Sequence, residues 1–328
     1  MKRLILPLHR LLTPAAGYRY SASWTTLLFA VLLTPVTLSA EEKYDALYIM
    51  SSQAPAYMAF KETVQNQQGM SASPPDKHHF VTIDDLPATN LRELINNSQI
   101  VITLGQKSLH EIALWRIDRP HIATLLTLED YRNTRAETSL SQSKSCALVI
   151  DQPMDRIKQI IHNKLPDIRI AGIIDSPTNM IGEISDNLSQ EENDLKVVRI
   201  PLEKNIHATI KALSQSGADA IIARHNKQVY NSNTARNILI SSYHFNLPLI
   251  GYSSAFVKAG ALIGIYSTPE SVASDVIEII QRKDRCHRGN IFYPSGYAVE
   301  INPQVARSLG ITIDTSNLIQ TYQERPRK

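Results

Sequence analysis

The sequence predicts an α/β protein with two doubly wound parallel-sheet lobes. From Tyr44 onward, short runs of Ile, Val and Leu alternate with amphipathic stretches of helix length, which is typical of βαβ units. The alternation forms two series of about 100 residues each, which favours two lobes over one large sheet. Hydrophobic residues make up 43% of the 328 residues and charged residues 20%, which excludes a disordered chain.

The first series runs from residue 44 to residue 126. Strands are expected at four apolar runs, which are residues 46–50, 79–83, 100–104 and 122–126. Helices are expected at the amphipathic stretches between them, which are residues 57–67, 86–96 and 108–115. The polar stretch 131–144 lacks either period, so it is expected to separate the two halves.

The second series runs from residue 147 to residue 251. Its expected strands are residues 147–150, 168–174, 196–200, 220–223 and 249–251. Its expected helices are residues 154–163, 180–189, 206–215 and 233–243. Gly217 is placed to end one of these helices, and Pro248 to open a strand.

The first 40 residues have the layout of a secretory signal peptide. Basic residues precede the apolar run 25–38, and Ser39 and Ala40 precede the first acidic residues of the chain. The run is shorter than the roughly 20 residues that a membrane span needs. We therefore expect cleavage after Ala40 and a periplasmic location, with an uncleaved membrane anchor as the alternative.

The charge of the chain is concentrated in this leader. The whole chain has a net charge of +3, but the leader contains four of the 34 basic residues and none of the 31 acidic residues, which leaves residues 41–328 at −1. A nearly neutral body has no strong electrostatic attraction to nucleic acid. No nucleic-acid partner is therefore expected.

The two cysteines, Cys146 and Cys286, would lie in an oxidising compartment after export. They either pair with each other or remain as two buried thiols, and their spacing does not decide between these outcomes. Neither has the spacing of a metal site.

Motifs of the common enzyme classes are absent from the sequence. There is no phosphate-binding P-loop, no GxSxG elbow, no HExxH and no GxGxxG after a strand. His78 and His79 are adjacent in a strand, so they face opposite sides and cannot bind one metal together. Asp84 and Asp85 are expected to cap a helix. We expect a protein that is not an enzyme and has no cofactor or metal.

The C-terminal third carries a resemblance to a known family. Residues 256–264 read FVKAGALIG, an amphipathic helix follows from Pro269 to Arg282, and Val299-Glu-Ile-Asn302 then leads into Ala306-Arg-Ser-Leu-Gly-Ile-Thr312. This order resembles the substrate-binding proteins of ABC importers of the tryptophan and tyrosine type. Thinner matches extend the resemblance over most of residues 44–315.

The resemblance implies the periplasmic-binding-protein type I fold, in which two lobes hold a ligand between them. Lobe 1 would comprise residues 41–143 and 256–288, and lobe 2 residues 144–255 and 289–328. The chain would cross between lobes before Cys146, near residues 252–256 and near residues 297–300. Each cysteine would then lie near a crossing, where a bridge between them could restrain the hinge.

The candidate ligand-binding residues follow the predicted strands. In parallel α/β sheets, ligands bind outside the C-terminal ends of the strands, where helix N-termini offer free N–H groups. The residues at these ends are Ser51, Ser52, Gly105, Gln106, Lys107, Ser108, Ser176, Asn226, Gln228 and Ser253. Tyr57, Tyr230 or Tyr252 could supply an apolar wall. The alternative for each Ser or Asn is a role as a cap or turn former.

The expected function is that of a periplasmic solute-binding protein, which would deliver a small polar ligand to an ABC permease. The family usually has Gly-Thr-Pro after the third strand, where this chain has Gly105, Gln106 and Lys107, and it often has an Asp at the position of Asn226. These departures favour an alternative, in which the same fold serves as the extracytoplasmic sensor or adaptor of a membrane receptor.

Overall fold

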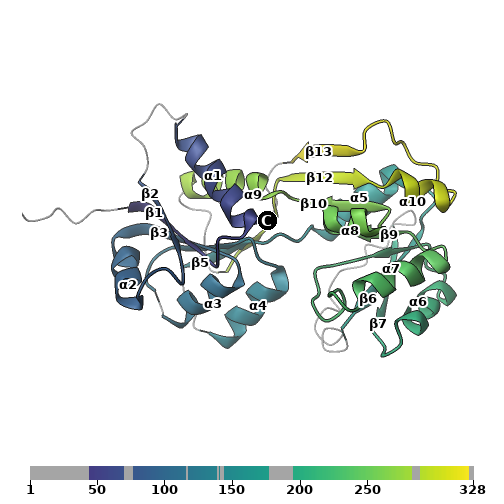
Figure 1. Cartoon of the computed structure of the whole chain (residues 1–328), viewed down its shortest axis with the longest axis horizontal. Coiled ribbons are helices and arrows are strands. Elements are labelled where there is room, and N and C mark those ends of the chain that lie inside the picture. The colour runs from purple at the N-terminus through teal and green to yellow at the C-terminus, as the bar shows by residue number, and fades with distance from the viewer. Residues whose placement is uncertain are drawn as a thin grey trace, which may run out of the picture. The chain divides into compact units, whose positions relative to one another are not determined.

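The computed structural model describes residues 44–69, 77–115, 117–138, 140, 144–176, 195–282 and 289–324. These residues belong to one compact unit that begins at Glu41. Within it, two β-sheets with helices on both faces are connected by three chain crossings (Figure 1). The α/β class with two doubly wound, mainly parallel sheets is confirmed.

The first sheet, as far as the chain is described, has six parallel strands in the order β2-β1-β3-β4-β5-β11. The strands are β1 (Tyr44–Met50), β2 (His78–Thr82), β3 (Ser98–Leu104), β4 (His121–Thr124), β5 (Ser145–Leu148) and β11 (Ile291–Phe292). Strands β1, β3, β4 and β5 are buried over most of their length because helices cover both faces, whereas the edge strands β2 and β11 are only partly buried.

Five helices cover this sheet. They are α1 (Pro55–Gly69), α2 (Ala88–Asn96), α3 (Gln106–Leu114), α4 (Leu128–Glu137) and α9 (Pro269–Gln281). Phe60 of α1 and Val276 of α9 pack in one core with Tyr48 of β1, whereas α2, α3 and α4 pack against the other face. Helix α9 follows β6 to β10 in the sequence. A late segment of the chain therefore returns from the second lobe to pack on the first.

The second sheet repeats this order. Its described strands run β7-β6-β8-β9-β10-β12-β13, and the first five are parallel, whereas β12 and β13 are antiparallel additions. The strands are β6 (Ile170–Asp175), β7 (Lys196–Pro201), β8 (Ala220–Ile222), β9 (Leu249–Gly251), β10 (Ile263–Tyr266), β12 (Gly296–Ile301) and β13 (Ile319–Gln323).

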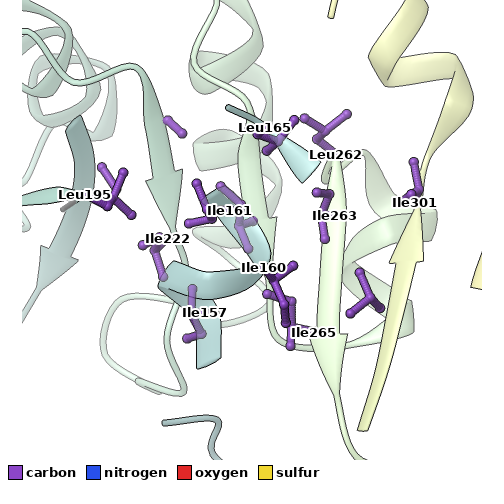
Figure 2. Close-up of a cluster of buried hydrophobic side chains, with 14 of the residues drawn as sticks. Ile157, Ile160, Ile161, Leu165, Leu195, Ile222, Leu262, Ile263, Ile265 and Ile301 are labelled. Carbon is purple, nitrogen blue, oxygen red and sulfur yellow. The ribbon is translucent and has the colours of Figure 1, made fainter. Parts of the chain in front are cut away.

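The helices of the second lobe divide between its two faces. They are α5 (Met154–Lys164), α6 (Ile206–Gln215), α7 (Ala235–His244), α8 (Ser254–Ala259) and α10 (Pro303–Ser308). Ile157, Ile160 and Ile161 of α5 cover one face, and Figure 2 shows them against side chains of β8, β10 and β12. Helices α6, α7 and α8 pack in a separate core on the other face.

Most expected strands and helices are confirmed to within a few residues, but α4 replaces part of the expected polar break. Its buried residues are Leu128, Asp130, Tyr131 and Thr134, so half of its inner face is polar and the helix lacks the apolar period of a typical helix. Thr127 caps it by accepting a hydrogen bond from Asp130 N. The expected helix at residues 180–189 lies outside the described residues.

The lobe boundaries differ from those expected. Strand β5 pairs with β4 in the first sheet, and β10 pairs with β9 and β12 in the second. The crossings are therefore residues 149–153, 267–268 and 293–295, where the chain passes from one sheet to the other. The expected crossings before Cys146, near residues 252–256 and near residues 297–300 are wrong because those segments lie within or next to elements of a single lobe.

One cysteine of the chain lies in the first lobe. Cys146, in β5, is fully buried in the core that β5 shares with α9, and it is disulfide-bonded. Cys286 lies outside the described residues, so its pairing with Cys146 stays a prediction.

The expected helix cap at Asp84 and Asp85 is wrong. These residues do not cap α2, since that helix begins after Pro87 without a side-chain cap. No helix in the described part of the chain is long and apolar enough to cross a membrane.

His121 provides a test of the first core. Its side chain is completely buried, and its Nε2 lies 2.9 Å from Thr103 Oγ1. Burial lowers the pKa of His121 to about 4, below its ordinary value. Below about pH 6.5 the unfolded chain therefore binds a proton that the folded chain excludes, so this histidine lowers stability as the pH falls.

Replacing His121 by Gln should flatten this pH dependence. Between pH 7 and pH 5, the free energy of unfolding of the wild type should fall by about 2 kcal/mol more than that of His121→Gln. Denaturant titrations at both pH values measure the difference. His244→Gln, at an exposed site, is the control and should keep the full fall. An equal fall in His121→Gln and the wild type would contradict the argument.

Candidate functional site: a ligand cleft at the strand ends

The C-terminal ends of β1 and β3 are joined by a pair of serines. Ser51 Oγ accepts a hydrogen bond from Ser108 N at 2.9 Å and donates to Ser108 Oγ at 3.1 Å. Ser108 Oγ in turn donates to the carbonyl oxygens of Leu104 and Gly105. Strands β1 and β3 flank the point where the strand order reverses, and this point is where ligands bind in doubly wound sheets.

Gly105 lets a tyrosine hydroxyl approach this point. Its φ is 92°, and a Cβ there would collide with the Tyr57 hydroxyl and lie 2.8 Å from Ser51 Oγ. Burial raises the pKa of Tyr57, and the charge of Asp130 also raises it, whereas a hydrogen bond with Ser51 and the charge of Lys227 lower it. The Tyr57 hydroxyl therefore lies among polar groups of both lobes.

Lys227 of the second lobe reaches the first lobe. It lies in the loop after β8, and its Nζ donates to Asp130 Oδ1 at 2.8 Å and to Oδ2 at 3.1 Å. It also donates to Gln106 Oε1 at 2.9 Å, in the first residue of α3. The Lys227 side chain is 69% exposed, so the pair adds only about 0–1 kcal/mol to stability. It nevertheless marks where the two rows of strand ends face each other.

A carboxylate and a histidine with displaced pKa values lie beside this contact. Asp151, in the first crossing, accepts a hydrogen bond from Leu128 N at 2.7 Å. Burial raises the pKa of Asp151 to about 6, against the effects of that hydrogen bond and of the Arg224 charge. Burial lowers the pKa of His225 to about 4, which keeps its ring neutral at pH 7. Displaced values of this kind are frequent at binding sites.

The second lobe adds an aromatic wall. The centres of the His225 and Tyr252 rings lie 4.0 Å apart, and the centres of the Tyr252 and Phe256 rings lie 4.8 Å apart. A small pocket of about 20 Å³ opens here, lined by residues of the first crossing and of the loops after β8 and β9. Neutral aromatic rings beside charged groups suit a ligand that has both a polar and a flat part.

Comparison with solved structures identifies the fold. No protein-family model and no curated protein sequence matches the chain. A ligand-free, open substrate-binding protein with adhesive properties from Clostridium difficile is 12% identical, with a TM-score of 0.60 over 83% of this chain and 97% of that one. The chain has the fold of type I periplasmic binding proteins.

Two other structures of this fold match to a similar extent. One is an ABC domain in complex with L-Trp from Streptococcus pneumonia, 16% identical, with a TM-score of 0.51 over 84% of this chain and 97% of that one. The other is a conserved domain protein from Vibrio cholerae, 15% identical, with the same TM-score and coverage. At these identities the likeness establishes the type I fold and no ligand.

The predicted site residues of the first lobe fall into two groups within this fold. Ser51, Gly105, Gln106 and Ser108 come together at the ends of β1 and β3, as the contacts above show. Ser52 and Lys107 do not join them through any contact described. Ser52 Oγ accepts a hydrogen bond from Ala54 N at 3.3 Å, and Lys107 forms an exposed ion pair of 2.6 Å with Asp84.

The predicted site residues of the second lobe mostly support its own backbone. Asn226 Oδ1 accepts hydrogen bonds from Gln228 N and Val229 N, and Ser253 Oγ caps α8 by accepting one from Phe256 N at 3.3 Å. Ser176 is completely buried after β6, and the Gln228 side chain is exposed. For Asn226 and Ser253 the alternative role as turn former and cap is the observed one.

Of the three tyrosines considered as a wall, two lie at the strand ends. Tyr57 contacts Ser51 and Tyr252 contacts His225. Tyr230 instead packs in the core of the second lobe, edge-on to Phe256.

Sequence reasoning missed Asp130, Lys227, Asp151 and His225 as site residues. Lys227 and His225 adjoin the predicted Asn226, so the sequence located the loop but not these two side chains. Asp130 was missed because α4 was not recognised, and Asp151 because the crossing was placed elsewhere.

Substituting Gly105 by Ala tests how closely Tyr57 and Ser51 approach the glycine. The variant should unfold at a lower temperature than Gly260→Ala, because both glycines have positive φ but nothing lies within 4 Å of a Cβ at Gly260. Forcing the Tyr57 ring away should add about 1–3 kcal/mol of destabilisation. Thermal unfolding of both variants measures this, and equal losses would mean that the contact is loose.

Proposed function

We propose that this protein is a periplasmic solute-binding protein of an ABC importer and captures a small polar ligand, an amino acid or a related molecule, between its lobes. The observation that carries the proposal is the contact of Lys227 with Asp130 and Gln106 at the facing strand ends of both lobes. A ligand in this place is within reach of charged, hydroxyl and aromatic groups together.

The chemistry of these groups supports binding without catalysis. Lys227 and Arg224 offer cationic donors, Asp130 offers an acceptor, and Tyr57 offers a hydroxyl. His225 and Tyr252 offer flat apolar surface on the second lobe. Closing the lobes around a ligand excludes water and strengthens each of these hydrogen bonds. Release to a permease then requires only that the lobes open again.

A second candidate is an extracytoplasmic sensor or adaptor for a membrane receptor. It is favoured by the use of Ser108, Asn226 and Ser253 in backbone support and by the small volume of the pocket beside His225. Both functions place the protein outside the inner membrane, but only the first requires an affinity for a free solute.

A thermal-shift screen of the mature chain against amino acids, peptides, nucleosides and sugars should find a stabilising ligand, because a ligand that binds only the folded state raises the unfolding midpoint. Titration calorimetry with that ligand should show at least about fivefold weaker binding for Lys227→Ala, as expected when a charged ligand group loses its partner.

The matched control is Lys211→Ala, which removes an exposed lysine from α6, away from the strand ends. It should bind like the wild type. Equal affinity of Lys227→Ala and the wild type would place the ligand elsewhere. A screen without any stabilising compound would favour the sensor or adaptor.

Export is tested separately. Expressed with its leader in a Gram-negative host, the protein should accumulate in the periplasmic fraction and begin at Glu41, because residues 1–40 have the layout of a cleaved signal. N-terminal sequencing and mass spectrometry of the fraction measure this. Full-length protein retained in the membrane would instead identify residues 25–38 as an anchor.

A further inference from the structure

Ser295, in the third crossing, is held from the first lobe. Asp275 of α9 accepts hydrogen bonds from Ser295 N, at 2.8 Å, and from Ser295 Oγ. Both residues are buried, with 1% of Ser295 and 4% of Asp275 exposed. A buried carboxylate that accepts two hydrogen bonds from one residue fixes the position of that residue relative to α9.

The same serine is held from the other side by the end of the last strand. Gln323 Nε2 donates to Ser295 Oγ at 2.6 Å, and Glu324 N donates to the Ser295 carbonyl oxygen at 2.8 Å. Strand β13 runs antiparallel to β12, with Gln323 opposite Gly296. The chain therefore returns along the whole of β12 and ends its pairing at the third crossing (Figure 1).

Arg156 connects this strand end to the first crossing. Its side chain is completely buried, with one terminal nitrogen 2.6 Å from Gln152 Oε1 and the other 3.3 Å from Glu324 Oε2. The guanidinium lies 4.2 Å from the centre of the Tyr297 ring, and the Tyr297 hydroxyl donates to Glu324 Oε1 at 2.9 Å. Glu324 is thus the counter-charge of a buried cation.

The second crossing belongs to the same network. Gln152 Nε2 donates to Ser267 Oγ at 3.0 Å, and Ser267 Oγ donates to the Gly296 carbonyl oxygen at 2.7 Å. Hydrogen bonds therefore join all three crossings. A change in the angle between the lobes has to be absorbed by backbone rotations in these crossings, so it strains or breaks contacts of this network.

We propose that Gln323 and Glu324, together with Arg156, form a hinge clasp that sets the angle between the two lobes. Glu324 and Arg156 are positioning residues: Arg156 lies in α5 and Glu324 directly after β13, both in contact with the crossings and away from the candidate ligand site, so they act on that site through the lobes. The effect of the clasp on ligand capture rests on the proposed function, but its effect on the lobe angle does not.

The position of Arg156 in the clasp depends on the charge of Glu324. Removing the charge of Glu324, whose side chain is 19% exposed, takes compensation away from the completely buried Arg156 guanidinium. In Glu324→Gln, the Arg156 guanidinium should leave its place or admit water, which loosens the first and third crossings together. The substitution keeps the size of the side chain and the backbone hydrogen bond to Ser295, so β13 itself should remain paired.

The experiment measures the distance between lobes in the mature chain without added ligand. Spin labels on non-natural amino acids at Glu93 and Lys211, both exposed in the middle of helices of different lobes, leave the cysteines untouched. Double electron–electron resonance should give a distribution for Glu324→Gln at least about twice as wide as that of the wild type. The distance distribution of Gln323→Ala should also be wider than that of the wild type.

The matched control is Glu111→Gln, which removes an exposed carboxylate from α3, on the face of the first sheet opposite to α9. Its distribution should equal that of the wild type. Circular dichroism confirms that each variant is folded, and if Glu324→Gln is not folded, Gln323→Ala alone decides the outcome. Wild-type widths in the folded variants would overturn the clasp.

This outcome is independent of the ligand screen. Unchanged widths would overturn the clasp and leave the proposed ligand site standing. A screen without a ligand would overturn the proposed solute-binding function and leave a widened distribution in Glu324→Gln as evidence for the clasp.

Discussion

Parallel pairing in one common strand order is the constraint on which the rest of the structure depends. Both sheets follow the order of a doubly wound fold over their parallel strands, so in each lobe all the loops that can carry ligand groups leave from one edge. Ser51, Gly105 and His225 lie at strand ends because of this pairing.

The polar residues at these ends meet two competing demands. The first turn of a helix and the loop before it contain N–H groups that need acceptors, and short side chains such as Ser and Asn supply them most readily. Ser51, Asn226 and Ser253 are engaged in this way. The side chains that extend beyond the backbone are the longer ones, above all Tyr57 and Lys227. The side chains that bind a ligand in the cleft are therefore expected among residues that make no hydrogen bonds to the loop backbone.

Polar contacts join all three crossings, in addition to the apolar cluster that Val149 and Tyr293 share. An apolar interface tolerates small sliding movements, whereas a buried charge tolerates only the few positions in which its partners are in place. Arg156 is completely buried and depends on Gln152 and Glu324. A hinge built in this way favours particular lobe angles, which is the property that a clamp needs.

The sequence by itself determined the fold class and β1 to β9 with most of the helices, because apolar periodicity reports directly on which faces become buried; β10 to β13, α4, α8 and α10 were not predicted. It also located the strand-end loops. Only the tertiary structure decided the lobe boundaries, since crossings such as residues 267–268 are too short to have a period. Lys227 and Asp130 are 97 residues apart in the chain, as are many pairs that never meet, so no local pattern marks them as partners. Local patterns record burial, but a contact between lobes depends on where the folding of each lobe carries its loops.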